Sequence, residues 1–209
     1  MKGLLIAAGN PPDKELLKEM ASKADMVVCA DGGLKYTLDS GVVPDIVMGD
    51  FDSLPEEYLR KIKSGVEVKK FPPEKDFTDT EIALKKMCDL GCTDITILGA
   101  IGTRMDHVLG NFFTLIEVHK NGATGRILDS HNEVEYLTLG ETKFYKGVFK
   151  YISIIPIEET MVSTQGFKYE VKALTIKPGS TIGISNELLD EEGEIEIHKG
   201  SCFVIKSKD

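Results

Sequence analysis

The sequence lacks several features that would assign a chain to a large class of proteins. No apolar run approaches the roughly 18 residues that a membrane-spanning helix requires, and no cluster of lysine and arginine offsets the net charge of −9. Nucleic acid and anionic membranes are therefore poor partners for this chain. The sequence also contains no Gly-x-Ser-x-Gly, no paired Cys–His arrangement and no Walker-type loop. Covalent nucleophilic catalysis is thus not indicated.

The cysteines are few and follow no paired spacing. Cys29, Cys88, Cys92 and Cys202 lie in apolar runs or at a helix end. Cys88 and Cys92 are separated by one helical turn, but neither a histidine nor a further cysteine stands close enough in the sequence to complete a zinc site. We therefore expect buried or half-buried structural thiols in a reduced, cytoplasmic protein.

Up to about Asp129, apolar runs alternate with amphipathic segments. The run at the N-terminus is broken by Gly9-Asn10-Pro11-Pro12, which favours a first buried strand over a signal peptide. This alternation predicts a mostly parallel α/β sheet that is covered on both faces. The predicted strands are Gly3–Ala8, Met26–Ala30, Asp45–Met48, Val66–Lys70 and Asp94–Leu98, and the predicted helices are Asp13–Lys23, Leu34–Ser40, Pro55–Ser64, Thr78–Leu90 and Met105–His119.

The last of these helices is strongly apolar. Its helical spacing predicts a core-facing stripe made of Leu109, Phe112, Phe113 and Ile116.

After Asp129 the pattern changes to short apolar runs separated by turn residues, without a helical period. We predict a second, all-β domain of about 80 residues, a sandwich or a barrel, joined by a short linker near Gly125–Asn132. The predicted strands are Glu133–Thr138, Lys143–Lys146, Tyr151–Pro156, Met161–Thr164, Glu170–Ile176, Ser180–Ser185, Glu194–His198 and Ser201–Lys206.

Acidic residues follow one of the predicted strands directly. The stretch Gly49-Asp50-Phe51-Asp52-Ser53 comes at a strand end, and Asp79 stands in the first turn of a later helix. Ligands of open parallel sheets bind beyond the carboxyl ends of the strands, so these carboxylates are expected to border one cleft. Hard oxygen ligands without nearby cysteine or histidine favour magnesium, which normally arrives with a polyphosphate.

Other strand ends carry similar signals. Asp31-Gly32-Gly33 follows the second strand and is expected at the same cleft, although a tight turn with an aspartate cap explains it equally well. In Lys75-Asp76-Phe77-Thr78-Asp79, Thr78 or Asp76 could cap the helix, with Glu81 completing a capping box after Thr78. The cap and a phosphate-binding role are compatible, and Lys75 is placed to neutralise phosphate charge.

The junction that runs from Gly99 to His107 is a third strand end with glycines and a helix start. Its Arg104 could bind a phosphate through the guanidinium fork, or could pair with Asp106 and fix the loop. His107 could act as a base, but a structural role is favoured over this one.

These motifs, taken together, resemble the thiamine pyrophosphokinase family over nearly the whole chain. The resemblance rests on Ala30-Asp31-Gly32-Gly33, Gly49-Asp50-Phe51-Asp52-Ser53, Lys75-Asp76-Phe77-Thr78-Asp79-Thr80-Glu81, Gly102-Thr103-Arg104-Met105-Asp106-His107, Gly166-Phe167-Lys168-Tyr169 and Gly183-Ile184-Ser185-Asn186-Glu187.

The resemblance implies two domains with different tasks. Residues 1–129 would form a Rossmann-like catalytic domain that binds ATP and magnesium, and residues 130–209 a C-terminal β-sandwich that binds thiamine. It also implies a homodimer whose active site lies between the catalytic domain of one subunit and the β domain of the other. The implied reaction is attack of the thiamine hydroxyl on the β-phosphorus of ATP, which gives thiamine diphosphate and AMP.

The resemblance also assigns roles to residues of this sequence. Magnesium would be held by Asp50, Asp52 and Asp79, with support from Asp31 and Asp76. ATP would be contacted by Lys75, Thr78, Gly99, Gly102 and Arg104. Asp106 could take the proton of the thiamine hydroxyl.

In the β domain, the resemblance implies that thiamine is bound by Tyr169, Ser185 and Asn186. Tyr169 stands where an aromatic residue, often tryptophan, stacks near the thiamine rings, and this chain has no tryptophan. An aromatic face in an acidic protein suits a cationic substrate.

Two other functions compete with this interpretation. A magnesium-dependent phosphohydrolase would use the same aspartates, but a haloacid-dehalogenase-type enzyme expects Asp-x-Asp-x-Thr, whereas Ser53 follows Asp52 directly. A non-enzymatic regulatory module would bind nucleotide without turning it over. Magnesium-dependent nucleotide turnover separates the enzymes from the regulatory module.

Overall fold

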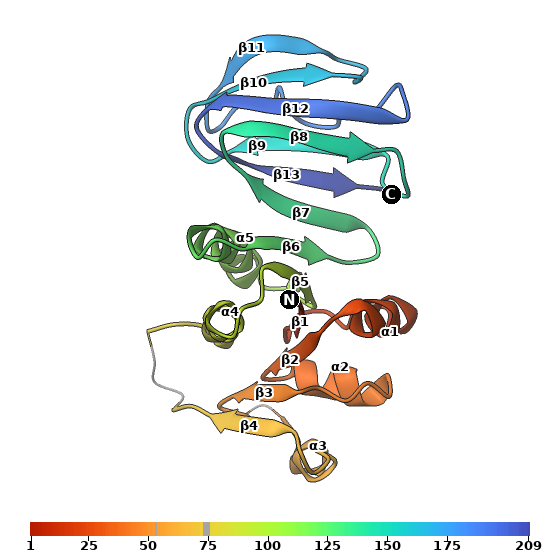
Figure 1. Ribbon diagram of the computed structural model, residues 1–209, viewed down its shortest axis with the longest axis vertical. Helices are drawn as coiled ribbons and strands as arrows, with labels where there is room; N and C mark the ends of the chain where they lie inside the picture. The colour runs from red at the N-terminus through yellow and green to blue at the C-terminus, as the bar shows by residue number, and fades with distance from the viewer. Residues whose placement is uncertain (53, 73–75) are drawn as a thin grey trace. The chain divides into compact units, whose positions relative to one another are not determined.

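Residues Met1–Ser130 form the first of two units and contain a parallel sheet with helices on both faces (Figure 1). The computed structural model describes residues 1–52, 54–72 and 76–209. The strands run in the order β4-β3-β2-β1-β5-β6, and each pairs with its neighbour in parallel. Their bounds are β1 (Lys2–Ile6), β2 (Met26–Ala30), β3 (Ile46–Gly49), β4 (Glu67–Lys70), β5 (Asp94–Leu98) and β6 (Thr124–Leu128).

The helices of this unit are divided between the two faces of the sheet. Figure 1 shows α1 (Lys14–Lys23), α2 (Gly33–Asp39) and α3 (Glu56–Arg60) on one side, and α4 (Asp79–Asp89) and α5 (Met105–Lys120) on the other. The Thr78 hydroxyl accepts a hydrogen bond from the Glu81 backbone N–H at 3.2 Å, so the predicted cap of α4 is confirmed. Such caps set where a helix begins and how its first turn faces its neighbours.

The order of the strands creates a reversal beside β1. The chain moves from β1 outward to β4 and then returns to β5 on the other side of β1. The helices that follow β1 and β5 lie on opposite faces of the sheet (Figure 1), so the chain leaves these two neighbouring strands toward opposite faces at the carboxyl edge. Open α/β sheets bind their ligands at this point.

Residues His131–Asp209 form the second unit, which contains only strands. Antiparallel strands pair in the order β7-β13-β9, and a second antiparallel sheet has the order β11-β10-β12-β8. Their bounds are β7 (Asn132–Leu137), β8 (Gly140–Tyr145), β9 (Tyr151–Pro156), β10 (Thr160–Gln165), β11 (Val171–Ile176), β12 (Glu192–Lys199) and β13 (Cys202–Ser207). One apolar core joins both sheets, with Ile154 and Val204 from the first and Val162 and Ile195 from the second. The predicted fold class, a Rossmann-like α/β domain followed by a β-sandwich, is confirmed.

The division between the two units lies between Ser130 and His131, inside the range expected for the linker. The first part of that range belongs to β6, which pairs with β5, and Gly125 lets this strand pass close to Leu115 and Val118 of α5. The prediction of a strand at Ser180–Ser185 is wrong: this segment is a series of turns, with Ser185 at a φ of 58°. Both segments are short and mix polar with apolar residues, so their pattern did not distinguish strand from loop.

The predicted core stripe of α5 is also wrong. Leu109 and Phe113 are 52% and 50% exposed, whereas Val108, Leu115 and Val118 are buried. This helix carries apolar residues around most of its circumference, so more than one helical face satisfies the periodicity.

The four thiols match their predicted environment. All four cysteines are free; Cys29, Cys92 and Cys202 are buried and Cys88 is half-buried. Burial raises the pKa of the Cys29 and Cys202 thiols to about 12, which keeps both in the unreactive thiol form. Among the residues that the structure describes, no helix combines the length and apolar character that a bilayer crossing requires.

Phe167 is expected to be a main determinant of stability in the second unit. Its side chain is 2% exposed and lies in the core that joins the two sheets. Phe167→Ala should lower the free energy of unfolding by about 3–5 kcal/mol, since it removes a large buried ring and leaves a cavity. Tyr169→Ala, which truncates an exposed ring in the same segment, should change it by about 0.5 kcal/mol at most. Urea unfolding followed by circular dichroism measures both, and equal losses would contradict the assignment of Phe167 to the core.

Candidate active site

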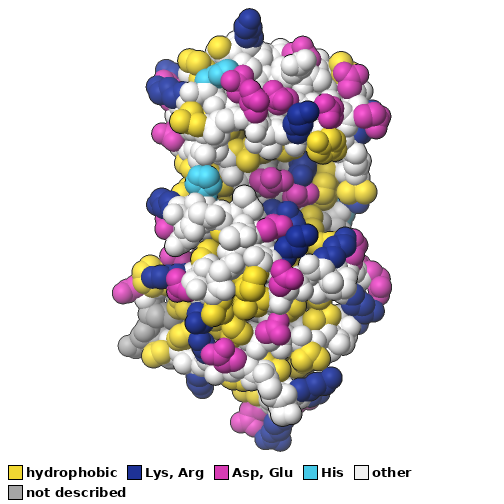
Figure 2. All heavy atoms as spheres, in the orientation of Figure 1, with side chains coloured by type: hydrophobic (Ala, Val, Ile, Leu, Met, Phe, Trp, Pro, Cys, Tyr) yellow, Lys and Arg dark blue, Asp and Glu magenta, His cyan; other side chains and the backbone are white. Residues whose placement is uncertain are grey.

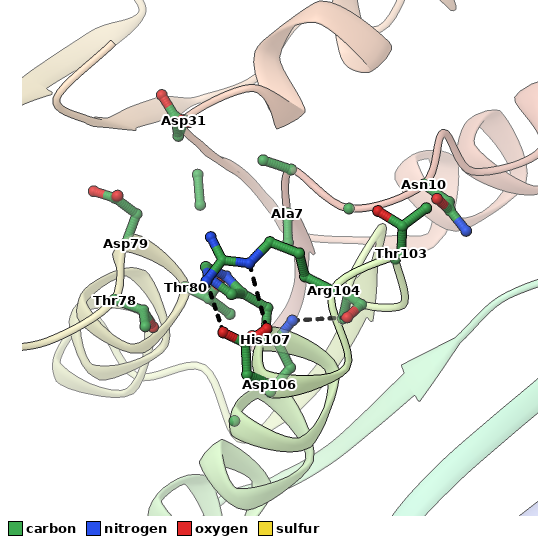
Figure 3. Close-up of a pocket in the computed structure, with 17 residues that line it drawn as sticks. Ala7, Asn10, Asp31, Thr78, Asp79, Thr80, Thr103, Arg104, Asp106 and His107 are labelled. Atoms are coloured by element: carbon green, nitrogen blue, oxygen red, sulfur yellow. Dashed lines mark hydrogen bonds and ion pairs between the residues drawn. The ribbon is translucent and has the colours of Figure 1, made fainter. Parts of the chain in front are cut away.

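A pocket of about 670 Å³ opens at the carboxyl edge of the parallel sheet, where the strand order reverses (Figure 3). Its walls come from the loops after β1, β2 and β5 and from the first turns of α4 and α5. The lining residues are Ala7, Ala8, Gly9, Asn10, Ala30, Asp31, Thr78, Asp79, Thr80, Ala100, Gly102, Thr103, Arg104, Asp106, His107, Gly110 and Asn111. Two helix N-termini therefore face one cavity, and each brings unsatisfied N–H groups and a partial positive charge.

The backbones of the loops that follow β1 and β5 lie close together beside this pocket. The Gly9 N–H donates to the Gly99 carbonyl at 2.7 Å, and the Asn10 N–H donates to the Ile101 carbonyl at 2.8 Å. A Cβ on Gly9 or on Gly99 would collide with the opposite loop, and Gly99 has a φ of 67°. Glycine at these two positions is therefore what allows the β1 and β5 loops to meet.

Two of the predicted aspartates line the pocket from different elements. Asp31 follows β2, and Asp79 begins α4; Figure 3 shows both side chains at the same side of the cavity. The Asp31 backbone N–H donates to the Met48 carbonyl at 2.8 Å. Gly49 approaches Asp31 so closely that a Cβ there would lie 3.0 Å from the Asp31 Cα. The end of β3 is thus held beside Asp31.

Asp50 and Asp52 flank an anchored aromatic residue. The Phe51 side chain is buried in the core of the first unit, with its backbone at a φ of 61°. The Asp52 N–H donates to the Asp50 carboxylate at 3.0 Å. Neither carboxylate lines the pocket, and within the described parts of the chain no three acidic, histidine or cysteine side chains lie close enough to hold a metal ion by themselves. Asp50, Asp52 and Asp79 are therefore not assembled into a three-carboxylate cluster.

Arg104 and Asp106 form an ion pair at the start of α5. The guanidinium donates through Nη2 to Asp106 Oδ2 at 2.6 Å and through Nε to Oδ1 at 3.3 Å. The hydrogen bond from Arg104 lowers the pKa of the Asp106 carboxyl, and the same contact raises the pKa of Arg104. Of the two alternatives expected for Arg104, the structure has the pairing with Asp106. Both side chains remain about two-thirds exposed, so a phosphate can still reach the guanidinium.

The other predicted residues of this site have different positions. Thr78 and Gly102 line the pocket. Gly99 does not line it but accepts a hydrogen bond from Gly9, which does, and Asp76 is exposed and does not line it. Lys75 and Ser53 fall outside the described residues. His107 is exposed and lines the pocket.

Several lining residues were missed by sequence reasoning. Asn10 follows β1, as Asp31 follows β2, and the same strand-end rule would have found it. Asn111 donates to the Ala100 carbonyl at 2.7 Å. Together with His107 and Gly110 it gives α5 one polar face at helical spacing, a signal that the apolar pattern of the helix obscured.

In the second unit, the structure brings Tyr169, Ser185 and Asn186 together. The Asn186 side chain accepts a hydrogen bond from the Tyr169 N–H at 3.1 Å and donates one to the Tyr169 carbonyl at 2.8 Å. The Ser185 N–H donates to the Ser153 hydroxyl at 2.9 Å. The Tyr169 ring is 64% exposed. Asn186 thus fixes the backbone that presents an aromatic ring to the surroundings.

Comparisons with known proteins agree over the whole chain. The family model "Thiamin pyrophosphokinase, catalytic domain" matches residues 17–125, and "Thiamin pyrophosphokinase, vitamin B1 binding domain" matches residues 141–202. The thiamine pyrophosphokinase of Bacillus subtilis is 35% identical, with 100% of both chains covered. Thiamin pyrophosphokinase 1 of Caenorhabditis elegans is 29% identical over 88% of this chain and 80% of its own. The crystal structure of the Bacillus subtilis enzyme superposes with a TM-score of 0.89 at 32% identity, with 100% of both chains covered.

Proposed function

The chain belongs to the thiamine pyrophosphokinase family, and we propose that it transfers the pyrophosphoryl group of ATP to the hydroxyl of thiamine at the pocket described above. The observation that carries this proposal is the convergence of two helix N-termini and Arg104 on one pocket. Free backbone N–H groups, helix dipoles and a guanidinium are the groups that bind phosphates in proteins. The family makes the protein a thiamine diphosphokinase, a transferase that forms thiamine diphosphate.

The triphosphate of ATP is assigned to the N-termini of α4 and α5. Thr78 already uses its hydroxyl to cap α4, so its contribution is to fix the first turn that carries Asp79. Gly99 and Gly102 let the backbone approach the nucleotide closely. Lys75 remains a proposed phosphate contact on sequence grounds.

Magnesium suits the oxygen donors around the pocket. Asp31 and Asp79 line it, and Asp50 and Asp52 follow the neighbouring strand. Magnesium in nucleotide sites typically takes only one or two carboxylates and completes its shell with water and phosphate oxygens, so a ready cluster of three carboxylates is not required. When bound, it would neutralise phosphate charge. We assign its ligands to Asp50, Asp52 and Asp79, with Asp31 and Asp76 in supporting positions.

The chemistry requires positioning and charge neutralisation rather than a covalent intermediate. The thiamine hydroxyl oxygen bonds to the β-phosphorus and releases its proton to solvent water, the bond from that phosphorus to the oxygen of the α-phosphate breaks, and AMP leaves. Arg104 is proposed to stabilise the charge that develops on the phosphates. Asp106 is a poor proton acceptor because its ion pair with Arg104 lowers its pKa. We therefore assign Asp106 to hold the Arg104 fork at the pocket.

Thiamine is assigned to the exposed face of Tyr169 in the second unit, with Ser185 and Asn186 beside it. An aromatic face attracts a cationic ring system. Asn186 acts in this proposal through the Tyr169 backbone, since its side-chain amide is already bonded there.

A homodimer with the site shared between subunits remains part of the proposal. Large apolar side chains near Tyr169 are exposed, with Ile182 at 65% and Leu189 at 62%. A second copy of the chain would cover such side chains. Sedimentation equilibrium that gave a single species of 23.0 kDa would contradict the homodimer.

The proposed activity is tested by separating the products formed from ATP, thiamine and magnesium. We expect AMP and thiamine diphosphate in equal amounts, and AMP only when thiamine is present. ADP with thiamine monophosphate would indicate attack on the γ-phosphorus instead. Phosphate release without thiamine would support the phosphohydrolase, and no nucleotide turnover would support the regulatory module.

A further inference from the structure

Three polar side chains on the four-stranded sheet of the second unit form a chain of contacts. The Ser163 Oγ lies 2.7 Å from His198 Nε2, and His198 Nδ1 lies 3.3 Å from Glu196 Oε1. Ser163 belongs to β10, and the other two residues belong to β12. The order hydroxyl, imidazole, carboxylate is that of a serine nucleophile, its general base and the group that orients the base.

The Glu196 carboxylate lies beside His198 Nδ1. Because a carboxylate attracts an N–H group, we place the proton of the neutral imidazole on Nδ1. His198 Nε2 is then the acceptor, and the Ser163 hydroxyl donates to it. The imidazole therefore faces Ser163 with the nitrogen that can take a proton.

Local irregularities of the sheet bring these residues together. The pairing of β10 with β12 contains a bulge in which His198 is the extra residue. The pairing of β10 with β11 shifts register at Ser163, and Ala173 on the opposite strand has a φ of 49° and donates its N–H to the Ser163 Oγ at 3.0 Å. Bulges turn side chains away from their regular direction and are frequent beside functional sites. A positive φ at a residue other than glycine costs energy, so it persists only where the surroundings enforce it.

The three side chains are accessible. The side chains of His198 and Glu196 are 31% and 41% exposed, and Ala173 is exposed beside Ser163. Acidic side chains are numerous on the second unit, which occupies the upper part of Figure 2, drawn in the orientation of Figure 1. An exposed sheet face in a chain with a net charge of −9 suits a small, uncharged or cationic molecule rather than a large anionic one.

We propose that Ser163 is an activated nucleophile and the acceptor site for an acyl group from small activated esters. The Ser163 Oγ bonds to the carbonyl carbon of the ester while its proton moves to His198 Nε2. The bond from that carbon to the alcohol oxygen then breaks, and the leaving alkoxide or phenoxide takes the proton from His198. The product is an acyl-serine, and no oxidant, reductant or metal is needed.

The probe is 4-nitrophenyl acetate with the full-length purified protein. We expect release of nitrophenolate with acetylation of Ser163, identified by peptide mass mapping. His198→Gln should slow acetylation of this serine about 100-fold, the usual contribution of a general base, and Glu196→Gln should slow it less. Ser180→Ala removes an exposed serine elsewhere in the same unit and should leave the rate unchanged.

Formation of thiamine diphosphate by each variant shows that the chain is still folded, because none of these residues belongs to the proposed active site. The proposal is overturned if Ser163 stays unmodified in the active wild-type protein. It is also overturned if Ser163 is acetylated at the same rate in wild type and His198→Gln, or no faster than Ser180. These last outcomes would leave the contacts as structural hydrogen bonds. The acetylation measurement itself requires neither ATP nor thiamine.

Discussion

Replacing Asp79 with asparagine is expected to lower kcat/KM for ATP by roughly 10²–10³-fold, the loss typical of removing one electrostatic contact from a reacting centre. The side chain lines the pocket at the first turn of α4. Asparagine has nearly the same size as aspartate and can still form hydrogen bonds, but it lacks the negative charge and has an NH2 group in place of one carboxylate oxygen, so the carboxylate proposed to bind magnesium is lost. The measurement is steady-state formation of AMP at several magnesium concentrations, with the magnesium requirement expected to rise.

Glu81→Gln is the matched control for this variant. Glu81 stands in the same first turn, but it lines a separate groove between α4 and α5. Both substitutions remove a negative charge near the helix N-terminus, so both should cost about 0.3–1 kcal/mol of stability. Glu81→Gln should keep nearly full activity. If the two variants lost activity equally, the loss would come from the helix rather than from a ligand role of Asp79.

Arg104→Ala should lower kcat by roughly 10³-fold, because an arginine that stabilises charge on transferring phosphates contributes 10³–10⁵-fold in related chemistry. Arg104→Lys should recover only part of this loss, since lysine keeps the charge but not the planar fork. Single-turnover measurements with saturating ATP and thiamine separate this effect on the chemical step from weaker binding.

Asp106→Asn distinguishes a positioning residue from a base. If Asp106 acts by holding Arg104, Asp106→Asn should cost much less than Arg104→Ala, and the double variant should be no slower than Arg104→Ala alone. The dependence of the rate on pH should be the same in Asp106→Asn as in the wild type. A changed pH dependence in Asp106→Asn, with a rate as low as that of Arg104→Ala, would restore Asp106 as the proton acceptor.

Much of this site could be predicted because strand ends are visible in a sequence. Two buried apolar runs end just before Asp31 and Gly99, and these ends mark the carboxyl edge of the sheet. Because the strands are parallel, the two ends lie at the same edge. The cap at Thr78 was predictable for a similar reason, since it depends on residues within one helical turn. A local sequence pattern is sufficient to predict a structural feature that depends only on neighbouring residues.

The unpredicted parts depend on contacts between distant segments. The buried face of α5 is set by what packs against it, and β6 is recognisable as a strand only from its pairing with β5. Ser163 and His198 are 35 positions apart and meet because of bulges. Bulges have no reliable sequence signature, so the sequence alone does not show that Ser163 and His198 lie side by side.

The glycine contact between the β1 and β5 loops has a consequence for the engineering of this enzyme. Backbone carbonyl and N–H groups are the same for every residue type. A ligand that contacts the backbone of these loops is therefore recognised through the course of the backbone and not through the identity of the side chains. A side chain at Gly9 or Gly99 would collide with the opposite loop. Substitution at either position is therefore expected to break the contact between the loops rather than to change which nucleotide binds. A library that aims to change the preferred nucleoside triphosphate should therefore randomise the rim, at Asn10, Thr103 and Asn111, and leave Gly9 and Gly99 untouched.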